Sequence, residues 1–339
     1  MTTTIKNGDP ASGSGVGMIS IIMASHNGGA TLALTLEAFR GIASPAGGFE
    51  IIAVDNASSD GTRDILEQYR DRLPLTVLSE PRQGKSFALN QGIGAARGDL
   101  VVFADDDILP DPQWLEAYRQ AAARHPAVDL FAGQVRHHWQ KPPPLWLLRL
   151  AEEGRSYAGT PVGEPEGPVG AIFFKGVNFM ARRSVTEAVR FSERPDVNFA
   201  GTTVSAGGED TAFVKEALSR GHKAHYVPDA CVRHIVRPAQ VGIRPVFQRY
   251  LRIGRSMTLS DPGQFDPEGA RLLGYPRYLF RTVPRDALRA LRYWVSGDSH
   301  AAASELIGVA MTCGRAQQWR KQPARRRQGG PTTGMEDSA

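Results

Sequence analysis

The stretch VVFADDDILPDP, residues 101–112, joins an apolar run typical of a buried strand to three consecutive aspartates, Asp105, Asp106 and Asp107. Three adjacent carboxylates repel one another, and packing has no need of them. A divalent cation such as Mg²⁺ or Mn²⁺ offsets this repulsion, because it prefers oxygen ligands and often bridges protein carboxylates to substrate phosphates. The alternative is a solvated acidic turn that caps a helix beginning near Pro112.

Upstream of Asp105, apolar runs of strand length alternate with segments of helical periodicity. The apolar runs lie at residues 18–27, 49–62, 75–81 and 99–110. The helical segments lie at residues 30–43, 62–73 and 84–98, and Gly98 is the expected end of the last one. Near-continuously apolar strands with helices between them predict an α/β fold whose sheet is mostly parallel and covered by helices on both faces.

Polar loops follow three of these predicted strands. They are Ser25 to Asn27, Asp55 with Asn56, and the cluster from Asp105 to Asp107. In an open parallel sheet, ligands bind beyond the carboxyl ends of the strands. We therefore expect these loops, which are far apart in sequence, to converge at one edge of the sheet. That position favours a cation-binding role for the aspartates over a solvated turn.

The size and composition of the chain fit a protein without membrane spans. With 339 residues it can bury one large core, or one core plus an appendage. Its two cysteines imply no disulfide framework, and residues 1–17 are polar and rich in Gly and Ser, without the apolar core of a signal peptide. No stretch approaches the roughly 18 apolar residues that span a bilayer. We predict a cytoplasmic protein with disordered ends at residues 1–17 and 321–339.

Six segments of the chain occur in the order and spacing that are typical of family 2 glycosyltransferases. The segments are ISIIMASHN (19–27), IIAVDNASSDGT (51–62), GKSFALNQGIGAARGD (84–99), VVFADDDILP (101–110), KGVNFMARRSV (175–185) and GGEDTAFVKEALSRGHKAHYVPDACVRH (207–234). The resemblance covers roughly residues 18–235. It implies the GT-A fold, a Rossmann-like nucleotide-binding architecture, which we expect to occupy residues 18–236.

This resemblance implies an inverting, metal-dependent sugar transfer of the hexosyltransferase type, from a nucleotide-sugar that we expect to be a UDP-sugar. Asp105 and Asp107 would hold Mn²⁺ or Mg²⁺, which neutralises the charge that builds up on the diphosphate leaving group. Asp106 would lie near the donor ribose, Asp55 would recognise the base, and Lys85 would lie near the base and the phosphates. The remaining expected walls of the nucleotide pocket are Ser25, Asn27 and Asn56.

Inversion requires a base on the face of the sugar opposite the leaving group, because a sugar hydroxyl is a poor nucleophile. The sequence GGED, residues 207–210, supplies candidates, since its two glycines let a loop approach the substrate closely. The resemblance makes Asp210 the base, with Glu209 orienting the acceptor or the loop. The alternative is that both acids merely complement the N-terminus of the helix that follows.

Two later residues have open roles. His234 lies in a segment, residues 226–236, that reads as an edge strand. Some members of the family use a histidine here as a further metal ligand, and the alternative is a surface residue or a satisfied core residue. Asn178 either lines the acceptor side or serves a turn.

Beyond Pro238 the alternation stops, and three helical segments mix apolar residues with arginine. They lie at residues 244–260, 275–297 and 301–322. Basic amphipathic helices with aromatic residues suit an anionic membrane surface, and similar tails occur on family members that extend lipid-linked oligosaccharides. We predict that residues 237–320 place the protein peripherally at the inner face of the cytoplasmic membrane. The alternative is that these helices only pack on the catalytic domain. The prolines at 142–144, between Trp139 and Trp146, either lie near the acceptor or form a rigid connector.

Three functions fit the sequence. The first is glycosyl transfer to a saccharide or lipid-linked saccharide in cell-surface polysaccharide or glycolipid biosynthesis. The second is a nucleotidyltransferase that acts on a sugar phosphate, but SHNGGATL, residues 25–32, lacks the basic residue that such a phosphate loop carries. The third is nucleic-acid binding, which the net charge of +5 favours, but arginines scattered among apolar helices form no recognition motif. We expect the first function, with no nucleic-acid partner.

Overall fold

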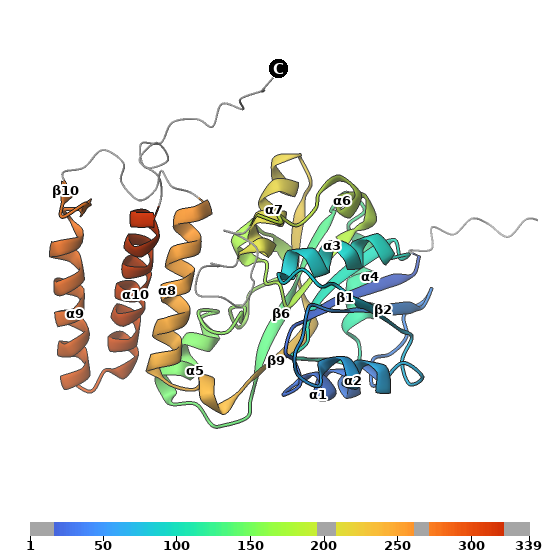
Figure 1. Cartoon of the computed structure of the whole chain (residues 1–339), viewed down its shortest axis with the longest axis horizontal. Helices are drawn as coiled ribbons and strands as arrows, with labels where there is room; N and C mark the ends of the chain where they lie inside the picture. Colours follow the sequence, from blue (N-terminus) through green and yellow to red (C-terminus); the bar gives the residue numbers. More distant parts are fainter. Residues whose placement is uncertain (1–16, 195–207, 261–270, 322–339) are drawn as a thin grey trace, which may run out of the picture.

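The computed structural model describes residues 17–194, 208–260 and 271–321. Figure 1 shows a unit built around a sheet on the right and a group of helices on the left. The tails that were expected to be disordered, residues 1–17 and 321–339, lie outside the described residues except for residues 17 and 321.

Within the described residues, a nine-stranded sheet forms the centre of the larger unit. Its first half consists of four parallel strands, β1 (Ile19–Ser25), β2 (Phe49–Asp55), β3 (Leu75–Ser79) and β4 (Leu100–Asp105). Its second half mixes strand directions and consists of β5 (Ile108–Pro110), β6 (Leu130–Trp139), β7 (Gly167–Pro168), β8 (Asn178–Arg182) and β9 (Ala224–Val236). The strand order is β3-β2-β1-β4-β8-β6-β9-β5, with β7 beside β9. The predicted α/β fold is confirmed.

Helices cover both faces of the sheet, because alternate residues of a strand point to opposite sides. Ile21 of β1 is fully buried against one layer of helices, and Ile22 is fully buried against the other. Full burial of such a side chain contributes about 1.5–3 kcal/mol. The first layer contains α1 (Leu32–Phe39), α2 (Thr62–Gln68) and α4 (Trp114–Arg124). The second contains α3 (Lys85–Ala95), α6 (Arg183–Ala188) and α7 (Glu209–Ser219).

The prediction of an edge strand over residues 226–236 is wrong. β9 pairs with β6 along one side and with β5 and β7 along the other. The polar residues of this segment mimic the alternation of a half-exposed strand. His234 is nevertheless buried, at 6% exposure, because β5 pairs beside it. Its polar partners are Asp107, in the turn before β5, and the carbonyl of Tyr157.

Gly98 does not end α3, which stops at Ala95, so this expectation is also wrong. The glycine instead allows the chain to pass close to the start of β1. A Cβ atom at Gly98 would lie only 2.6 Å from the backbone nitrogen of Ser20. The signal in the sequence was therefore a close backbone approach rather than a helix end.

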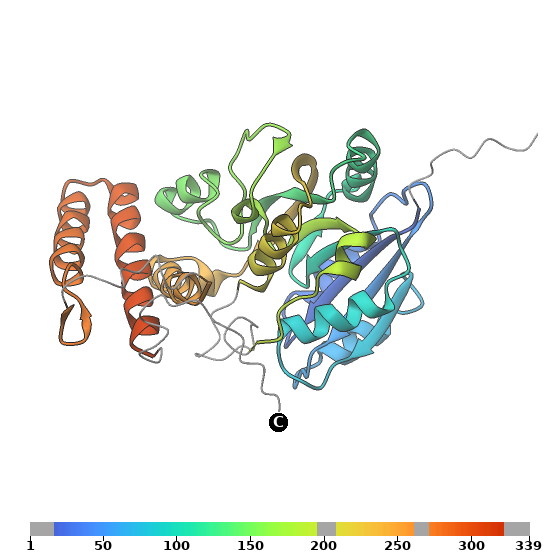
Figure 2. The same cartoon turned by 90° about the horizontal axis from the view of Figure 1, so that it is seen from above.

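Three long helices follow β9 and match the three predicted helical segments. They are α8 (Ile243–Ser260), α9 (Leu279–Val295) and α10 (Ser299–Lys321). α8 lies nearest the sheet, α10 in the middle and α9 outermost, and the view from above in Figure 2 agrees. Leu150 of α5 (Leu145–Glu152) shares a buried cluster with Val246 of α8 and Ile307 of α10, which joins the two units. The short elements are η1 (Ala171–Phe173), η2 (Pro238–Gln240), β10 (Arg271–Leu272) and β11 (Tyr275–Pro276).

None of the described helices combines the length and the apolar character that crossing a bilayer requires.

Candidate active site

The carboxyl ends of β1, β2 and β4 lie side by side, because these strands pair in parallel register. Ser25 is opposite Asp55, and Ala24 is opposite Asp105. The three polar loops that were expected to converge therefore meet at one edge of the sheet, and the site is built outward from that edge.

Asp106 and Asp107 form the turn between β4 and β5. Thr35 of α1 fixes this turn, since its hydroxyl donates to the Asp106 carbonyl at 3.0 Å and accepts the Ile108 N–H at 3.1 Å. The Ser25 hydroxyl donates to Asp106 Oδ2. Burial, together with the neighbouring Asp107 carboxylate, raises the pKa of Asp106 to about 7. The crowding that the sequence implies is therefore real in the folded chain.

Gly28, in the loop after β1, leaves room for this carboxylate. A Cβ atom at Gly28 would overlap Asp106 Oδ2 and would lie 2.5 Å from Ser25 Oγ. Neither neighbour is the end of a long flexible side chain, so neither can move aside at small cost. The glycine therefore belongs to the construction of the site.

His234 of β9 reaches the aspartate turn from the far half of the sheet. Its Nε2 lies 3.1 Å from Asp107 Oδ2, and its Nδ1 lies 2.9 Å from the carbonyl oxygen of Tyr157. Burial by itself would lower the pKa of His234, but the Asp107 carboxylate raises it above the ordinary value. Conversely, burial would raise the pKa of Asp107, and His234 lowers it. The two groups stabilise each other's charged forms.

These residues fit a bound divalent cation. Asp107 Oδ1 is buried and has no hydrogen-bond partner among the described residues. A bound cation would replace the proton on His234 Nε2, while Nδ1 donates to the Tyr157 carbonyl, which is the usual arrangement of a metal-binding histidine. Asp105, Asp107 and His234 thus offer the oxygen and imidazole donors that suit Mn²⁺ or Mg²⁺.

Lys85, the first residue of α3, joins the aspartates to the acids of α7. Its Nζ binds Asp105 Oδ1 and lies 3.9 Å from Glu209 Oε1. Burial opposes the charge of this amine, but Asp105, Glu209 and Asp210 together raise the pKa of Lys85. The ammonium group therefore stays charged and marks the centre of the site.

Glu209 and Asp210 begin α7 and differ in accessibility. Glu209 is buried, at 6% exposure, and burial raises its pKa to about 7 against the opposing effect of Lys85. Asp210 is only half-buried, and its Oδ2 accepts the Gly176 N–H at 2.7 Å. A molecule at this edge of the sheet can therefore reach Asp210 more readily than Glu209.

The predicted nucleotide loops are held by their own asparagines. Asn27, at φ 53°, accepts the Ser59 N–H at 2.8 Å and so ties the loop after β1 to the loop after β2. Asn56 donates to the carbonyls of Glu80 and Arg82 and accepts the Gly84 N–H at 2.8 Å. The side chain of Asn56 is therefore used to shape the pocket wall. Asp55 accepts the Ser58 N–H at 3.2 Å through Oδ1.

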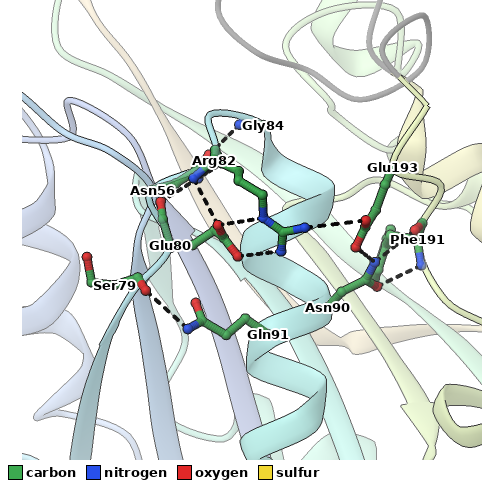
Figure 3. A network of polar contacts seen from close by, with 9 residues as sticks. All are labelled: Asn56, Ser79, Glu80, Arg82, Gly84, Asn90, Gln91, Phe191 and Glu193. Atoms are coloured by element: carbon green, nitrogen blue, oxygen red, sulfur yellow. Dashed lines mark hydrogen bonds and ion pairs between the residues drawn. The ribbon is translucent and has the colours of Figure 1, made fainter.

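A polar network extends this wall, as Figure 3 shows. The Arg82 guanidinium donates to both carboxylate oxygens of Glu80, at 3.0 and 2.8 Å, and lies 3.8 Å from Glu193. Asn90 of α3 exchanges two hydrogen bonds with the backbone of Phe191 and also donates to Glu193. The loop between β3 and Lys85 is thus held by Asn56 on one side and contacts Glu193 on the other.

Arg249 of α8 is a site residue that no sequence motif singles out. It is half-buried, its guanidinium carbon lies 5.5 Å from the centre of the Tyr157 ring, and it acts electrostatically on Asp107. Burial and the nearby Arg252 lower the pKa of Arg249. Lys175 similarly interacts electrostatically with Asp210, and burial lowers the pKa of Lys175. The arginine periodicity of α8 was a signal, but it points equally to solvent or to a membrane.

Asn178 has neither of the roles expected for it. The side chain is fully buried, and its oxygen accepts from Trp114 Nε1 and from the Tyr118 hydroxyl, both at 2.8 Å. Its nitrogen donates to the carbonyls of Gln134 and Ala230, at 2.9 and 2.8 Å. Asn178 is a structural residue that joins α4, β6, β8 and β9, because every polar atom of its amide is used inside the protein.

Comparisons with known proteins agree with this geometry. The family model described as "Glycosyl transferase family 2" matches residues 20–190. The glycosyltransferase AglE of Haloferax volcanii is 26% identical over 240 residues, which cover 70% of this chain and 72% of the relative. Validoxylamine A glucosyltransferase of Streptomyces hygroscopicus subsp. jinggangensis is 29% identical over 146 residues, covering 42% of this chain and 35% of the relative.

Solved structures agree with the fold. A mannosyltransferase from Pyrobaculum calidifontis, solved with GDP-Man and Mn²⁺, is similar with a TM-score of 0.61 and 18% identity, over 90% of this chain and 88% of the other. TarS of S. aureus, residues 1–349, is similar with a TM-score of 0.52 and 15% identity, over 85% and 90% of the two chains. The nucleotidyltransferase and nucleic-acid-binding alternatives do not explain the family match. The chain belongs to glycosyl transferase family 2, and it is a glycosyltransferase with the GT-A fold.

Proposed function

We propose that this enzyme transfers a sugar from a UDP-sugar to a saccharide or lipid-linked saccharide, with inversion, in cell-surface polysaccharide or glycolipid biosynthesis. The observation that carries the proposal is the position of Lys85. This half-buried cation joins Asp105, at the end of the strand where a donor diphosphate would lie, to the acids at the start of α7. Donor-side and acceptor-side groups thus occupy one continuous site.

In this proposal the nucleotide lies across the carboxyl ends of β1 and β2. Asp55 recognises the base, and Asp106 accepts from the donor ribose. Ser25, Asn27 and Asn56 line the pocket, the two asparagines by holding its loops in place. The rigid backbone of this wall supports the assignment, since a preorganised pocket loses less entropy when it binds a nucleotide.

Asp105, Asp107 and His234 would hold Mn²⁺ or Mg²⁺. A cation bound there neutralises the charge that develops on the nucleoside diphosphate as it leaves. Lys85 adds a fixed positive charge beside the same group. Arg249 adds a second, because it faces Asp107 from α8. These side chains stabilise the leaving group in a region from which water is partly excluded.

Asp210 is the proposed base. It takes the proton of the acceptor hydroxyl as that oxygen attacks the anomeric carbon, and the bond from that carbon to the diphosphate breaks on the opposite face. The Gly176 N–H, which donates to Asp210 Oδ2, fixes the carboxylate without protonating it. Glu209 is more deeply buried and orients the start of α7, since its Oε2 accepts the Gly208 N–H at 3.0 Å.

The surface of α9 supports a lipid-linked acceptor at a membrane. An exposed apolar stripe runs along this helix on residues one or two turns apart, and arginines flank it. The stripe consists of Phe280, Leu288, Leu291, Trp294 and Val295, which are 41–78% exposed. The arginines are Arg281, Arg285, Arg289 and Arg292. An apolar stripe beside a row of cations is the pattern of a helix that lies in the interface of an anionic bilayer.

A pocket connects this stripe to the larger unit. It has a volume of ≈ 440 Å³. Its lining comes from the loop before α5, from the start of α8 and from the last two helices, and includes Pro142, Pro143, Pro144, Trp146, Ile243 and Trp294. Trp294 belongs to both the pocket and the stripe. We assign the pocket to the lipid portion of the acceptor and place the protein peripherally at the inner face of the cytoplasmic membrane.

The function is tested by offering a panel of UDP-, GDP- and dTDP-sugars in Mn²⁺ and measuring the release of nucleoside diphosphate. We expect release from one UDP-sugar and its loss in Asp107→Ala. Release of nucleoside diphosphate only from a GDP-sugar or a dTDP-sugar would show that the proposed UDP-sugar donor is wrong. Release from none of the sugars, with every candidate acceptor fraction present, would contradict the proposed function.

A further inference from the structure

Three metal-binding side chains meet on the side of the sheet remote from the active site. They are His125 at the end of α4, Glu166 just before β7, and His225 near the start of β9. One ligand atom of each lies within 4.8 Å of the others. On β6, the strand paired with β9, six positions separate the partners of His225 and His234, because β9 bulges between the two histidines. Six positions correspond to roughly 20 Å at 3.3 Å per residue, so this cluster takes no part in the transfer chemistry.

The distances in this cluster suit a tetrahedral ion. Glu166 Oε1 lies 3.2 Å from His125 Nε2 and 3.6 Å from His225 Nε2. Zinc binds nitrogen and oxygen at about 2.0–2.2 Å, so two ligands of a tetrahedral site lie about 3.3–3.5 Å apart. The two imidazole rings face each other with their centroids 4.2 Å apart and 34° between their planes.

His225 supplies a second, independent indication. The residue is 92% buried, and its Nε2 has no hydrogen-bond partner among the described residues, since Glu166 at 3.6 Å is too distant. A buried nitrogen without a partner costs free energy unless something binds it.

Arg124 holds the Glu166 carboxylate in place from outside the cluster. Its Nη2 donates to both oxygens of Glu166, at 3.0 and 3.2 Å. A hydrogen-bonded outer partner of this kind orients a metal-binding carboxylate. Without an ion, the cluster would be an ion pair that leaves the buried nitrogen of His225 unused.

We propose that His125, Glu166 and His225 bind one Zn²⁺ ion, with water as the fourth ligand. The set of two imidazoles and one carboxylate favours zinc over Mg²⁺, which prefers oxygen ligands alone. The ion joins the end of α4, the segment before β7 and the start of β9. It therefore acts as a structural link for the second half of the sheet, where strand directions are mixed.

The test uses the full chain without a histidine tag, because a tag binds the same ion. The Asp107→Ala background removes a ligand of the proposed active-site cation, so that only the remote cluster is measured. We expect one equivalent of zinc per chain by elemental analysis after dialysis. Co²⁺ in its place should show the visible absorption of a tetrahedral site, and Zn²⁺ should raise the unfolding temperature.

Glu166→Gln and His225→Gln should each weaken Zn²⁺ binding at least tenfold. Glu166 is exposed, so its variant is expected to fold even if the buried His225 variant does not. His222→Gln is the matched control, because His222 contacts Asp129 near the same strand but lies outside the cluster. Wild-type affinity in Glu166→Gln, equal loss in His222→Gln, or no zinc on the folded chain would overturn the proposal.

Discussion

His234 Nε2 lies 3.1 Å from Asp107 Oδ2, although 127 positions separate the two residues in the chain. Strand pairing produces this contact, since Ile108, the neighbour of Asp107, is opposite His234 in the β5–β9 pair. The far half of the sheet therefore contributes directly to the aspartate turn.

Replacing Asp107 by alanine should abolish sugar transfer, because it removes the carboxylate that pairs with His234 and carries the buried, unpartnered oxygen. UDP binding should weaken in Mn²⁺ and change little in EDTA. The measurement is a pair of UDP titrations with and without the metal, together with turnover. Full turnover by the wild-type enzyme in excess EDTA would refute the metal dependence.

Gly28→Ala should weaken donor binding while the chain stays folded, because the added methyl group overlaps Asp106 and crowds Ser25. Gly94→Ala is the matched control, since Gly94 lies in α3 with open space where a Cβ would stand. That control should leave binding unchanged and stabilise the helix by about 0.5–1 kcal/mol. Equal donor affinity in both variants would show that the Gly28 loop does not contact the nucleotide.

Leu291→Glu combined with Trp294→Glu should reduce binding to anionic vesicles, because both residues lie in the exposed stripe of α9. Leu34→Glu is the matched control, because Leu34 is a similarly exposed leucine, 49% accessible, on α1 of the sheet-containing unit. This variant should bind the vesicles as the wild type does. Co-sedimentation with vesicles that contain anionic lipid measures both. Membrane docking would be rejected if the wild-type chain fails to sediment or if the double variant sediments equally well.

Glu50 should make stability depend on pH. This buried carboxylate of β2 accepts from the Ser20 hydroxyl at 2.7 Å and from Arg97 through backbone and side chain. Burial alone would raise the pKa of Glu50, but Arg97 and Ser20 lower it. A lowered pKa in the folded state means that the stabilisation is complete above the pKa of the unfolded chain. It is lost as the pH falls through the folded pKa.

We therefore expect Glu50→Gln to cost roughly 1–3 kcal/mol of unfolding free energy at pH 7, the usual value for hydrogen bonds to a buried charge. The difference from wild type should shrink below about pH 4, near the pKa of an unperturbed glutamate. Urea unfolding at both pH values measures it. Glu67→Gln, at a surface ion pair, should cost little at either pH. A cost for Glu50→Gln that is independent of pH would contradict this account.

The first half of the fold could be predicted because its signals are local. The apolar run of β1, for example, is bounded by polar loop residues, and its parallel pairing with β2 follows from the helix between them. The convergence of Ser25, Asp55 and Asp105 then follows from the topology. The second half depends on contacts between distant segments, which a single sequence does not specify.

His234 and Arg249 illustrate that limit. A histidine in an alternating strand resembles an exposed residue until β5 and the Tyr157 segment cover it. Arg249 is one of several arginines on α8, and only the docking of that helix beside the site distinguishes it from the others. Asn178 stands in a motif of the family, but the partners of its four internal hydrogen bonds lie in three other elements, α4, β6 and β9.

The most direct test of the central claim is the comparison of Asp210→Asn with wild type, using the UDP-sugar that gives the highest release of UDP. Asparagine keeps the shape and can still accept the Gly176 N–H, but it cannot take a proton from a hydroxyl. Donor affinity should be unchanged, and transfer should fall by roughly 10²–10⁴-fold, the usual contribution of a general base. Glu209→Gln should cost less. Transfer by Asp210→Asn at the wild-type rate would contradict the account, and loss of donor affinity together with rate would make Asp210 structural.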